Sequence, residues 1–183
     1  MTRRPLAMLL VAAVCVACGG PIASSGAARP TSTGPSVSAT PSPTPGGVGD
    51  VPFVRITDRV PVATEAAAIR MAFDAGAAAS LVSEPPPIDY ATQAVLCVSL
   101  GERSTGGWSI TIQSITIEGA EMRILAREGR PRPGEAVTQA FTYPSDCAVV
   151  DRTVLPVGEL AVRADDTISD EFIVDAVIEV PAR

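Results

Sequence analysis

Residues 19–50 limit what this chain can fold into more than any other feature, because 23 of these 32 residues are Ser, Thr, Pro or Gly. Arg29 and Asp50 are the only charged residues among them. A segment with so few large apolar side chains cannot offset the entropy lost when its backbone is ordered. We therefore interpret residues 18–50 as a disordered tether and expect one globular domain over residues 51–183, which is long enough for a single core.

The amino terminus has the pattern of an export signal. Arg3 and Arg4 precede an uninterrupted apolar run over residues 6–17. Twelve residues are too few to cross a bilayer as a helix, which needs about 20, and the pattern is typical of a secretory signal. We interpret residues 1–17 as a lipoprotein-type signal peptide and expect the protein to be exported.

Cys18 is the predicted lipidation site. Ala17 directly before it and the glycines after it resemble a bacterial lipobox, although Cys15 stands where an aliphatic residue is usual. A lipid on Cys18 would anchor the protein to the membrane of a bacterial cell envelope, with the domain facing outside the cytoplasm. The alternative is an ordinary cleavable signal whose cysteines are incidental.

The composition excludes most side-chain catalysis. The chain has no His, and its 14 cationic residues are all Arg, against 20 Asp and Glu, which gives a net charge of −6. Without His or Lys there is no Ser-His-Asp triad, no Schiff-base lysine and no imidazole metal ligand. The acidic balance also lacks the basic footprint of a nucleic-acid-binding protein. We predict a protein that is not an enzyme, with no catalytic residue, cofactor or metal site and no nucleic-acid partner.

Residues 64–83 have the periodicity of a helix. Apolar residues recur every three or four positions, as at Ile69, Phe73 and Ala77. Thr64 is a candidate N-cap, and a run of three prolines follows residue 84 and would end the helix. The sequence therefore predicts one helix ahead of the rest of the domain.

The chain after residue 88 has the pattern of strands separated by turns. The predicted strands cover residues 94–100, 108–117, 122–127, 137–143, 147–150, 160–163 and 172–180. The first of these is apolar on both faces, which is typical of a central strand. The apolar alternation changes phase near Gln113 and Ser114, which predicts a β-bulge or a bend there. The expected fold is α+β and mainly β, an antiparallel sheet or sandwich with one N-terminal helix packed on it.

Two of the four cysteines, Cys97 and Cys147, lie in the predicted domain. In an exported protein such a pair is most simply a disulfide. The alternative is two buried free thiols, because Cys97 lies in an apolar strand where Cys packs as a small hydrophobic residue. We predict the disulfide.

The densest acidic cluster is formed by Asp165, Asp166, Asp170 and Glu171. A carboxylate pair can act in general acid–base catalysis. The spacing fits no calcium loop and lacks that loop's central glycine. We therefore interpret the cluster as a solvated loop between two strands.

A more specific pattern begins at Thr105, where Gly106, Gly107 and Trp108 open a strand, and it closes at Val137, Thr138 and Gln139, which lead to Pro144. This order resembles the carboxy-terminal domain of PrcB, the lipoprotein subunit of a bacterial surface protease complex. In that family Tyr usually stands where this chain has Trp108. The resemblance implies that the chain binds another protein, a secreted or surface protease, and helps to assemble or stabilise it.

The motif residues can also be explained by structural roles alone, without a function. Gly106 and Gly107 suit a positive φ or a close approach of two segments, and Pro144 ends a strand. Gln139 is expected to hydrogen-bond neighbouring backbone, at the turn of the two glycines. Trp108, if exposed, is the candidate anchor for a partner, although a lone Trp at the head of a strand is more often part of the core.

The sequence leaves three alternatives to a protein-binding subunit. The first is a protease inhibitor that presents a loop at residues 130–133, and the second is a carboxylate-dependent hydrolase. The third is an envelope lipoprotein with structural duties only. Peptide turnover in the presence of the domain separates the first, since an inhibitor lowers it and an assembly subunit does not.

Overall fold

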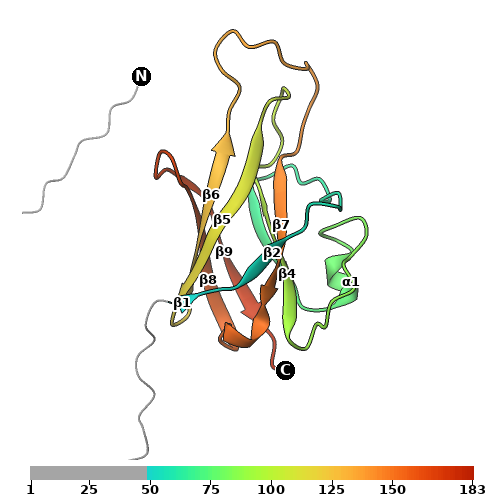
Figure 1. Ribbon diagram of the computed structural model, residues 1–183, viewed down its shortest axis with the longest axis vertical. Helices are drawn as coiled ribbons and strands as arrows, with labels where there is room; N and C mark the ends of the chain where they lie inside the picture. Colours follow the sequence, from blue (N-terminus) through green and yellow to red (C-terminus); the bar gives the residue numbers. More distant parts are fainter. Residues whose placement is uncertain (1–48) are drawn as a thin grey trace, which may run out of the picture. The chain divides into compact units, whose positions relative to one another are not determined.

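The computed structural model describes residues 49–183, which form two sheets that face each other (Figure 1). The first sheet contains, in spatial order, β1 (Gly49–Asp50), β5 (Ser109–Glu118), β6 (Glu121–Gly129), β8 (Gly158–Asp166) and β9 (Phe172–Val180). The second contains β2 (Phe53–Arg55), β7 (Ser145–Asp151), β4 (Gln93–Ser99) and β3 (Ala68–Ala72). A four-residue helix, α1 (Ala75–Ala78), and a 3-10 turn at Arg152–Val154 complete the described elements.

In the second sheet, β4 is buried on both faces, as its apolar pattern predicts. Its inward residues, such as Leu96 and Val98, share one core with residues of the first sheet, such as Ile124 and Leu160. On the other face, Val95 and Cys97 pack in a second cluster under α1 and the chain around it. The prediction of a mostly β domain with largely antiparallel pairing is confirmed; the exception is β6 and β8, which pair in parallel.

One continuous segment closes the sandwich between β5 and β7. The Val51 N–H donates to the Ile115 carbonyl of β5 at 2.9 Å, and the Pro52 carbonyl accepts from Asp151 of β7 at 3.1 Å. The first residues of the segment therefore belong to one sheet, as β1, and its last residues belong to the other sheet, as β2. Figure 1 shows it crossing between the two sheets.

The predicted β-bulge is confirmed, because the pairing of β5 with β6 shifts between Ile112 and Ser114. The structure also shows what supports it. The Ile112 N–H donates to the buried carboxylate of Asp146 on β7, at 2.7 Å. Arg55 of β2 binds the same carboxylate with its Nε, at 2.8 Å, so the bulge is fixed by a side chain from the opposite sheet.

The helix predicted over residues 64–83 is wrong. Residues 68–72 form β3, which pairs with β4, and only Ala75–Ala78 are helical. Ile69 and Phe73 match helical spacing, but with Met71 between them they also match alternation, and all three pack against the core between the sheets. Tertiary pairing with β4 decides between the two patterns.

The predicted N-cap is wrong as well. The Thr64 hydroxyl donates to the Ser99 Oγ at 2.6 Å, whereas the carboxylate of Asp74 caps α1 by accepting from the Ala77 N–H. The strand predicted over residues 137–143 is also absent: these residues form an irregular exposed segment with one isolated bridge, between Thr142 and Arg103.

The signal peptide, the lipidation site Cys18 and residues 18–48 of the predicted tether lie outside the described residues. Within residues 49–183 no helix is long and apolar enough to cross a membrane.

Candidate protein-interaction site

Two connecting segments form one surface at one end of the domain. Residues 100–108 link β4 to β5, and residues 130–144 link β6 to β7. We call these two segments the loop pair. Figure 1 shows the loop pair at the top, while β1 and the carboxyl terminus lie at the opposite end.

Backbone hydrogen bonds join the two segments along their length. The Leu100 N–H donates to the Pro144 carbonyl at 2.9 Å, and the Gly106 N–H donates to the Thr138 carbonyl at 2.8 Å. Between these points Arg103 and Thr142 exchange two bonds, of 2.8 and 2.9 Å. The loop pair thus continues, in irregular form, the antiparallel pairing of β4 with β7.

The strands below this surface are joined covalently. Cys97 of β4 and Cys147 of β7 are directly paired and form a disulfide, which confirms the prediction. Both cysteines are buried in the cluster under α1. The loop pair therefore starts from two strands that cannot separate, which limits how far its two segments can move apart.

Three of the predicted motif residues shape the loop pair. Gly107 has a φ of +85°, and a Cβ there would lie 3.0 Å from the Val137 Cγ1. A Cβ on Gly106 would lie 3.4 Å from the Cβ of Thr138. Pro144 accepts the Leu100 N–H and begins the exit into β7. Gly107 thus has the positive φ expected of it. Gly106 has no positive φ and a Cβ there would make an ordinary contact, and Pro144 ends no strand, because residues 137–143 form none.

Gln139 bonds to neighbouring backbone as expected, but not at the glycine turn. Its side chain is exposed, and its Nε2 donates to the carbonyl of Val137 at 3.4 Å, not to the glycine turn. The contact with that turn comes instead from the backbone of Thr138. The difference arises because residues 137–143 are not a strand, so Gln139 has no sheet neighbours to bond.

The aromatic residues of the loop pair differ in exposure. Trp108 is half-buried, with the guanidinium carbon of Arg103 at 5.1 Å from its ring centroid. The Tyr143 hydroxyl donates to the Glu102 carboxylate at 2.9 Å, and this hydrogen bond raises the pKa of Tyr143. Phe141 is 66% exposed. Sequence reasoning selected Trp108 and missed Phe141, because the exposure of an aromatic residue is not a property of the local pattern.

The acidic cluster is not a solvated loop throughout, since Asp165 and Asp166 are buried. The Asp165 carboxylate accepts from the Nε of Arg163 at 2.7 Å and from that of Arg123 at 2.9 Å. Burial opposes ionisation of Asp165, but these two bonds outweigh it and lower the pKa. Each oxygen is already engaged, so the carboxylate has a structural role.

Asp166 holds the turn between β8 and β9. Burial opposes its ionisation, but N–H groups of Glu128, Ser169 and Ile168 and the Ser169 hydroxyl donate to it and lower its pKa to about 2. An acid with so low a pKa cannot hold a proton for transfer near neutral pH. Among residues 49–183 no group of three or more His, Cys, Asp or Glu could hold a metal ion.

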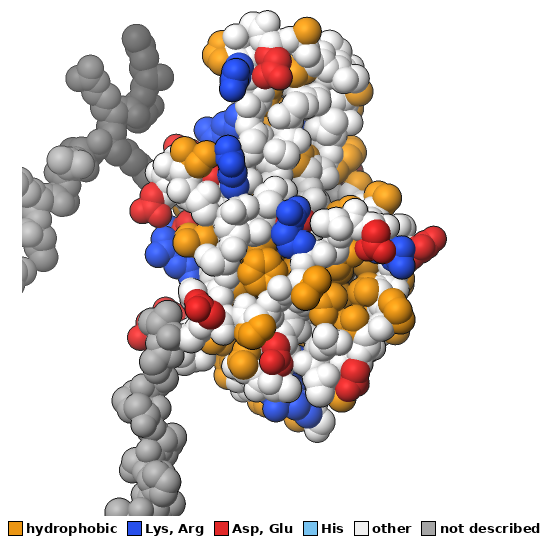
Figure 2. All heavy atoms as spheres, in the orientation of Figure 1, with side chains coloured by type: hydrophobic (Ala, Val, Ile, Leu, Met, Phe, Trp, Pro, Cys, Tyr) orange, Lys and Arg blue, Asp and Glu red, His pale blue; other side chains and the backbone are white. Residues whose placement is uncertain are grey.

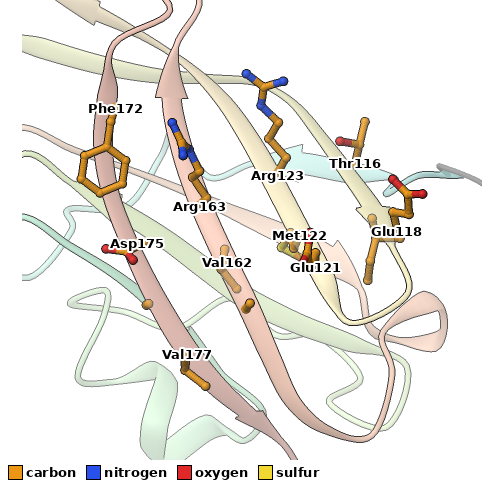
Figure 3. Close-up of a pocket in the computed structure, with 13 residues that line it drawn as sticks. Thr116, Glu118, Glu121, Met122, Arg123, Val162, Arg163, Phe172, Asp175 and Val177 are labelled. Atoms are coloured by element: carbon orange, nitrogen blue, oxygen red, sulfur yellow. The ribbon is translucent and has the colours of Figure 1, made fainter. Parts of the chain in front are cut away.

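A hollow of about 530 Å³ opens on the outer face of the first sheet (Figure 3). Arg123, Arg163 and Phe172 lie at one end of it, and Glu118 and Glu121 lie toward the other. The Arg163 guanidinium carbon lies 5.2 Å from the centroid of the Phe172 ring. Arg123 and Arg163 both form salt bridges with Asp165. Polar side chains of this kind are common on a sheet face that is exposed to water.

Residues 94–151 match the family model described as PrcB C-terminal. The resemblance predicted from the sequence is therefore confirmed over this segment, about a third of the chain. No curated protein and no solved structure matches the chain. The matched residues run from β4 through β7, so they include both segments of the loop pair and the disulfide.

Proposed function

We propose that this protein is an exported lipoprotein that acts as a non-catalytic, protein-binding subunit, and that its partner is a surface protease. The observation that carries the proposal is the extent of the family match. It runs from β4 through β7 and so contains the two disulfide-linked strands, the braced loop pair that they support, and β5 and β6 between the two loops. Only the family match suggests that the partner is a protease, and a shared domain does not by itself determine the partner.

The loop pair has the physical properties of an interaction surface. Functional loops are commonly positioned by a rigid scaffold, and here the scaffold is the β4–β7 pair with its disulfide. The surface offers exposed aromatic and arginine side chains, which are enriched in protein interfaces. The buried carboxylates Asp165 and Asp166, in contrast, are engaged by arginine side chains and backbone N–H groups.

A lipid on Cys18 is part of the proposal. It would hold the domain at the outer side of the membrane, and residues 18–48 would supply the distance between the membrane and the domain, since Gly49 and Asp50, predicted as part of the tether, form β1. The described part begins at Gly49, at the end of the domain away from the loop pair (Figure 1). With this arrangement the loop pair is directed away from the attachment point.

A protease inhibitor is the second candidate, and one observation favours it. Arg132 is exposed between Pro131 and Pro133, and its backbone N–H is held by the Glu135 carboxylate at 2.8 Å. A braced, exposed arginine of this kind resembles a substrate presented to a protease.

Site-specific photocrosslinking in the native membrane tests the proposal. A photoreactive amino acid replaces Ala140, which is exposed in the loop pair, or Glu179, which is exposed on β9 as the matched control. We expect a protease to be crosslinked in stoichiometric amounts from position 140 and not from position 179. If no protein is crosslinked from position 140, the proposal is wrong and a purely structural role is favoured.

Peptide turnover by the crosslinked protease, measured with and without the purified full chain, separates the two candidates. An assembly subunit leaves turnover unchanged or raises it. A stoichiometric loss of turnover would identify an inhibitor instead.

A further inference from the structure

We infer that the loop pair inserts Phe141 into an apolar pocket of its partner and that carboxylates surround this pocket. The inference rests on the proposed function, because it describes the surface of the same partner. It makes Phe141, not Trp108, the residue that determines affinity.

Phe141 is held ready for binding. The residue is 66% exposed. The next residue, Thr142, is fixed by two backbone bonds with Arg103 and by a side-chain bond to the Thr105 carbonyl at 2.8 Å. An apolar ring on a fixed backbone loses little conformational freedom on binding and gains the burial of its whole exposed surface. Anchors of protein interfaces combine these properties.

Exposure alone does not distinguish Phe141. Hydrophobic side chains are also exposed over the body of the domain, where Figure 2 shows several on one face, and Val177 on β9 is 70% exposed. Phe141 differs because it belongs to the family-matched segment and to the braced surface. Trp108 is less suited, since it is half-buried and Arg103 lies over its ring.

The charge of the loop pair indicates what surrounds the partner's pocket. The loop pair contains three arginines and two glutamates, a net charge of +1, whereas the remaining described residues sum to −10. Both glutamates are engaged, Glu102 by the Tyr143 hydroxyl and Glu135 by the backbone N–H of Arg132.

Two of the arginines, Arg103 and Arg132, form no salt bridge within residues 49–183. The backbone of Arg103 pairs with Thr142, the residue after Phe141. The guanidinium groups of these two arginines therefore have no carboxylate partner within the described residues, whereas Arg130 is paired with Glu128 and Glu171. Complementary carboxylates on the partner would pair with them.

The anchor is tested by measuring the binding of the full-length protein, in detergent, to the protease captured by the crosslinker at position 140. Phe141→Ala is expected to weaken binding at least about thirtyfold, the effect of truncating an interface anchor. Phe172→Ala removes the same side chain from the outer face of the first sheet, where it is 53% exposed, and should leave affinity within about twofold.

The charge is tested by the association rate. Arg132→Glu is expected to lower this rate roughly three- to tenfold at low ionic strength, and the loss should shrink as salt is added. Arg70→Glu on β3 makes the same change of charge in the second sheet and should have a much smaller effect. Thermal unfolding of each variant verifies that it is folded.

The two proposals fail in different ways. If no protease is crosslinked at all, the proposed function is wrong and this inference falls with it. If the protease binds, but Phe141→Ala binds as tightly as the wild type, or Arg132→Glu associates as fast or faster, the inference is wrong while the proposed function stands.

Discussion

At the scale of single residues, the buried acids determine where this domain is sensitive to pH. Asp166 is the clearest case, because its N–H and hydroxyl donors fix the β8–β9 turn and lower its pKa to about 2. A carboxyl group whose pKa is lower in the folded than in the unfolded state stabilises the fold when it is ionised. Its contribution is complete above about pH 4 and disappears as the pH falls toward 2.

We predict that Asp166→Asn lowers the free energy of unfolding by about 2 kcal/mol at pH 7, since the lost shift in pKa and the lost bonds act together. The difference between the variant and the wild type should become smaller between about pH 4 and pH 2. Urea unfolding of the full chain at several pH values measures both effects. Asp175→Asn changes an exposed carboxylate on β9 and should stay within about 0.5 kcal/mol of the wild type. An equal loss for Asp166→Asn at pH 7 and pH 2 would contradict this account.

At the scale of elements, the β4–β7 pair connects the core to the loop pair. Its disulfide closes a loop that contains β5, β6 and both segments of the loop pair. Restricting a loop of this size in the unfolded chain stabilises the fold by roughly 4 kcal/mol in the chain-entropy description.

We predict that replacing both Cys97 and Cys147 by Ala lowers the free energy of unfolding by roughly 3–4 kcal/mol, measured by urea unfolding of the full chain. Peptide-level thiol labelling of the denatured wild type checks the premise. The peptides with Cys97 and Cys147 should react only after reduction. Labelling of both without a reductant would show that the bridge is absent in the isolated protein.

The elements that could be predicted from the sequence are those whose apolar pattern favours one type of secondary structure. A short apolar run followed by a turn, as over residues 94–100, favours a strand buried on both faces, and β4 is such a strand. The phase change near Gln113 locates the bulge for the same reason, because alternation cannot otherwise bury Ile112 and Ile115 together. The pairing of Cys97 with Cys147 was predicted from their number in the domain together with the predicted export, and the disulfide is present.

The elements that were predicted wrongly depend on distant residues. Ile69 and Phe73 fit both a helix and a strand, and the choice is made by β4, which lies more than 20 residues later in the chain. Residues 137–143 alternate but meet only the irregular segment 100–108, so they form no strand. The exposure of Phe141 and the burial of Asp165 likewise depend on which elements pack beside them, and no local pattern reveals this.

At the scale of the whole molecule, the domain has two distinct ends. Gly49, the first of the described residues, lies at one end, and the loop pair lies at the other (Figure 1). The described residues carry 11 Arg and 20 Asp or Glu, a net charge of −9, although the loop pair itself is positive. If the domain is anchored through the residues before Gly49, the anchor is attached at the end opposite the loop pair.

The anchor itself gives the last prediction. Cys18→Ala removes the only proposed site for the lipid, so the protein should leave the membrane fraction or accumulate as an unprocessed precursor. Fractionation of cells followed by immunoblotting measures both outcomes. Cys15→Ala changes the other cysteine of the leader and leaves Cys18 in place, so it should stay in the membrane fraction. Unchanged processing and partition of Cys18→Ala would argue against lipidation.

The same variant separates the anchor from the interface. Residues 49–183 are unaltered in Cys18→Ala, so purified protein that has been released should bind the protease in solution as the wild type does. On cells, crosslinking from position 140 should decrease because the local concentration that the membrane provides is lost. Since Phe141→Ala should weaken binding in both settings, the two variants distinguish the contribution of proximity from that of contact.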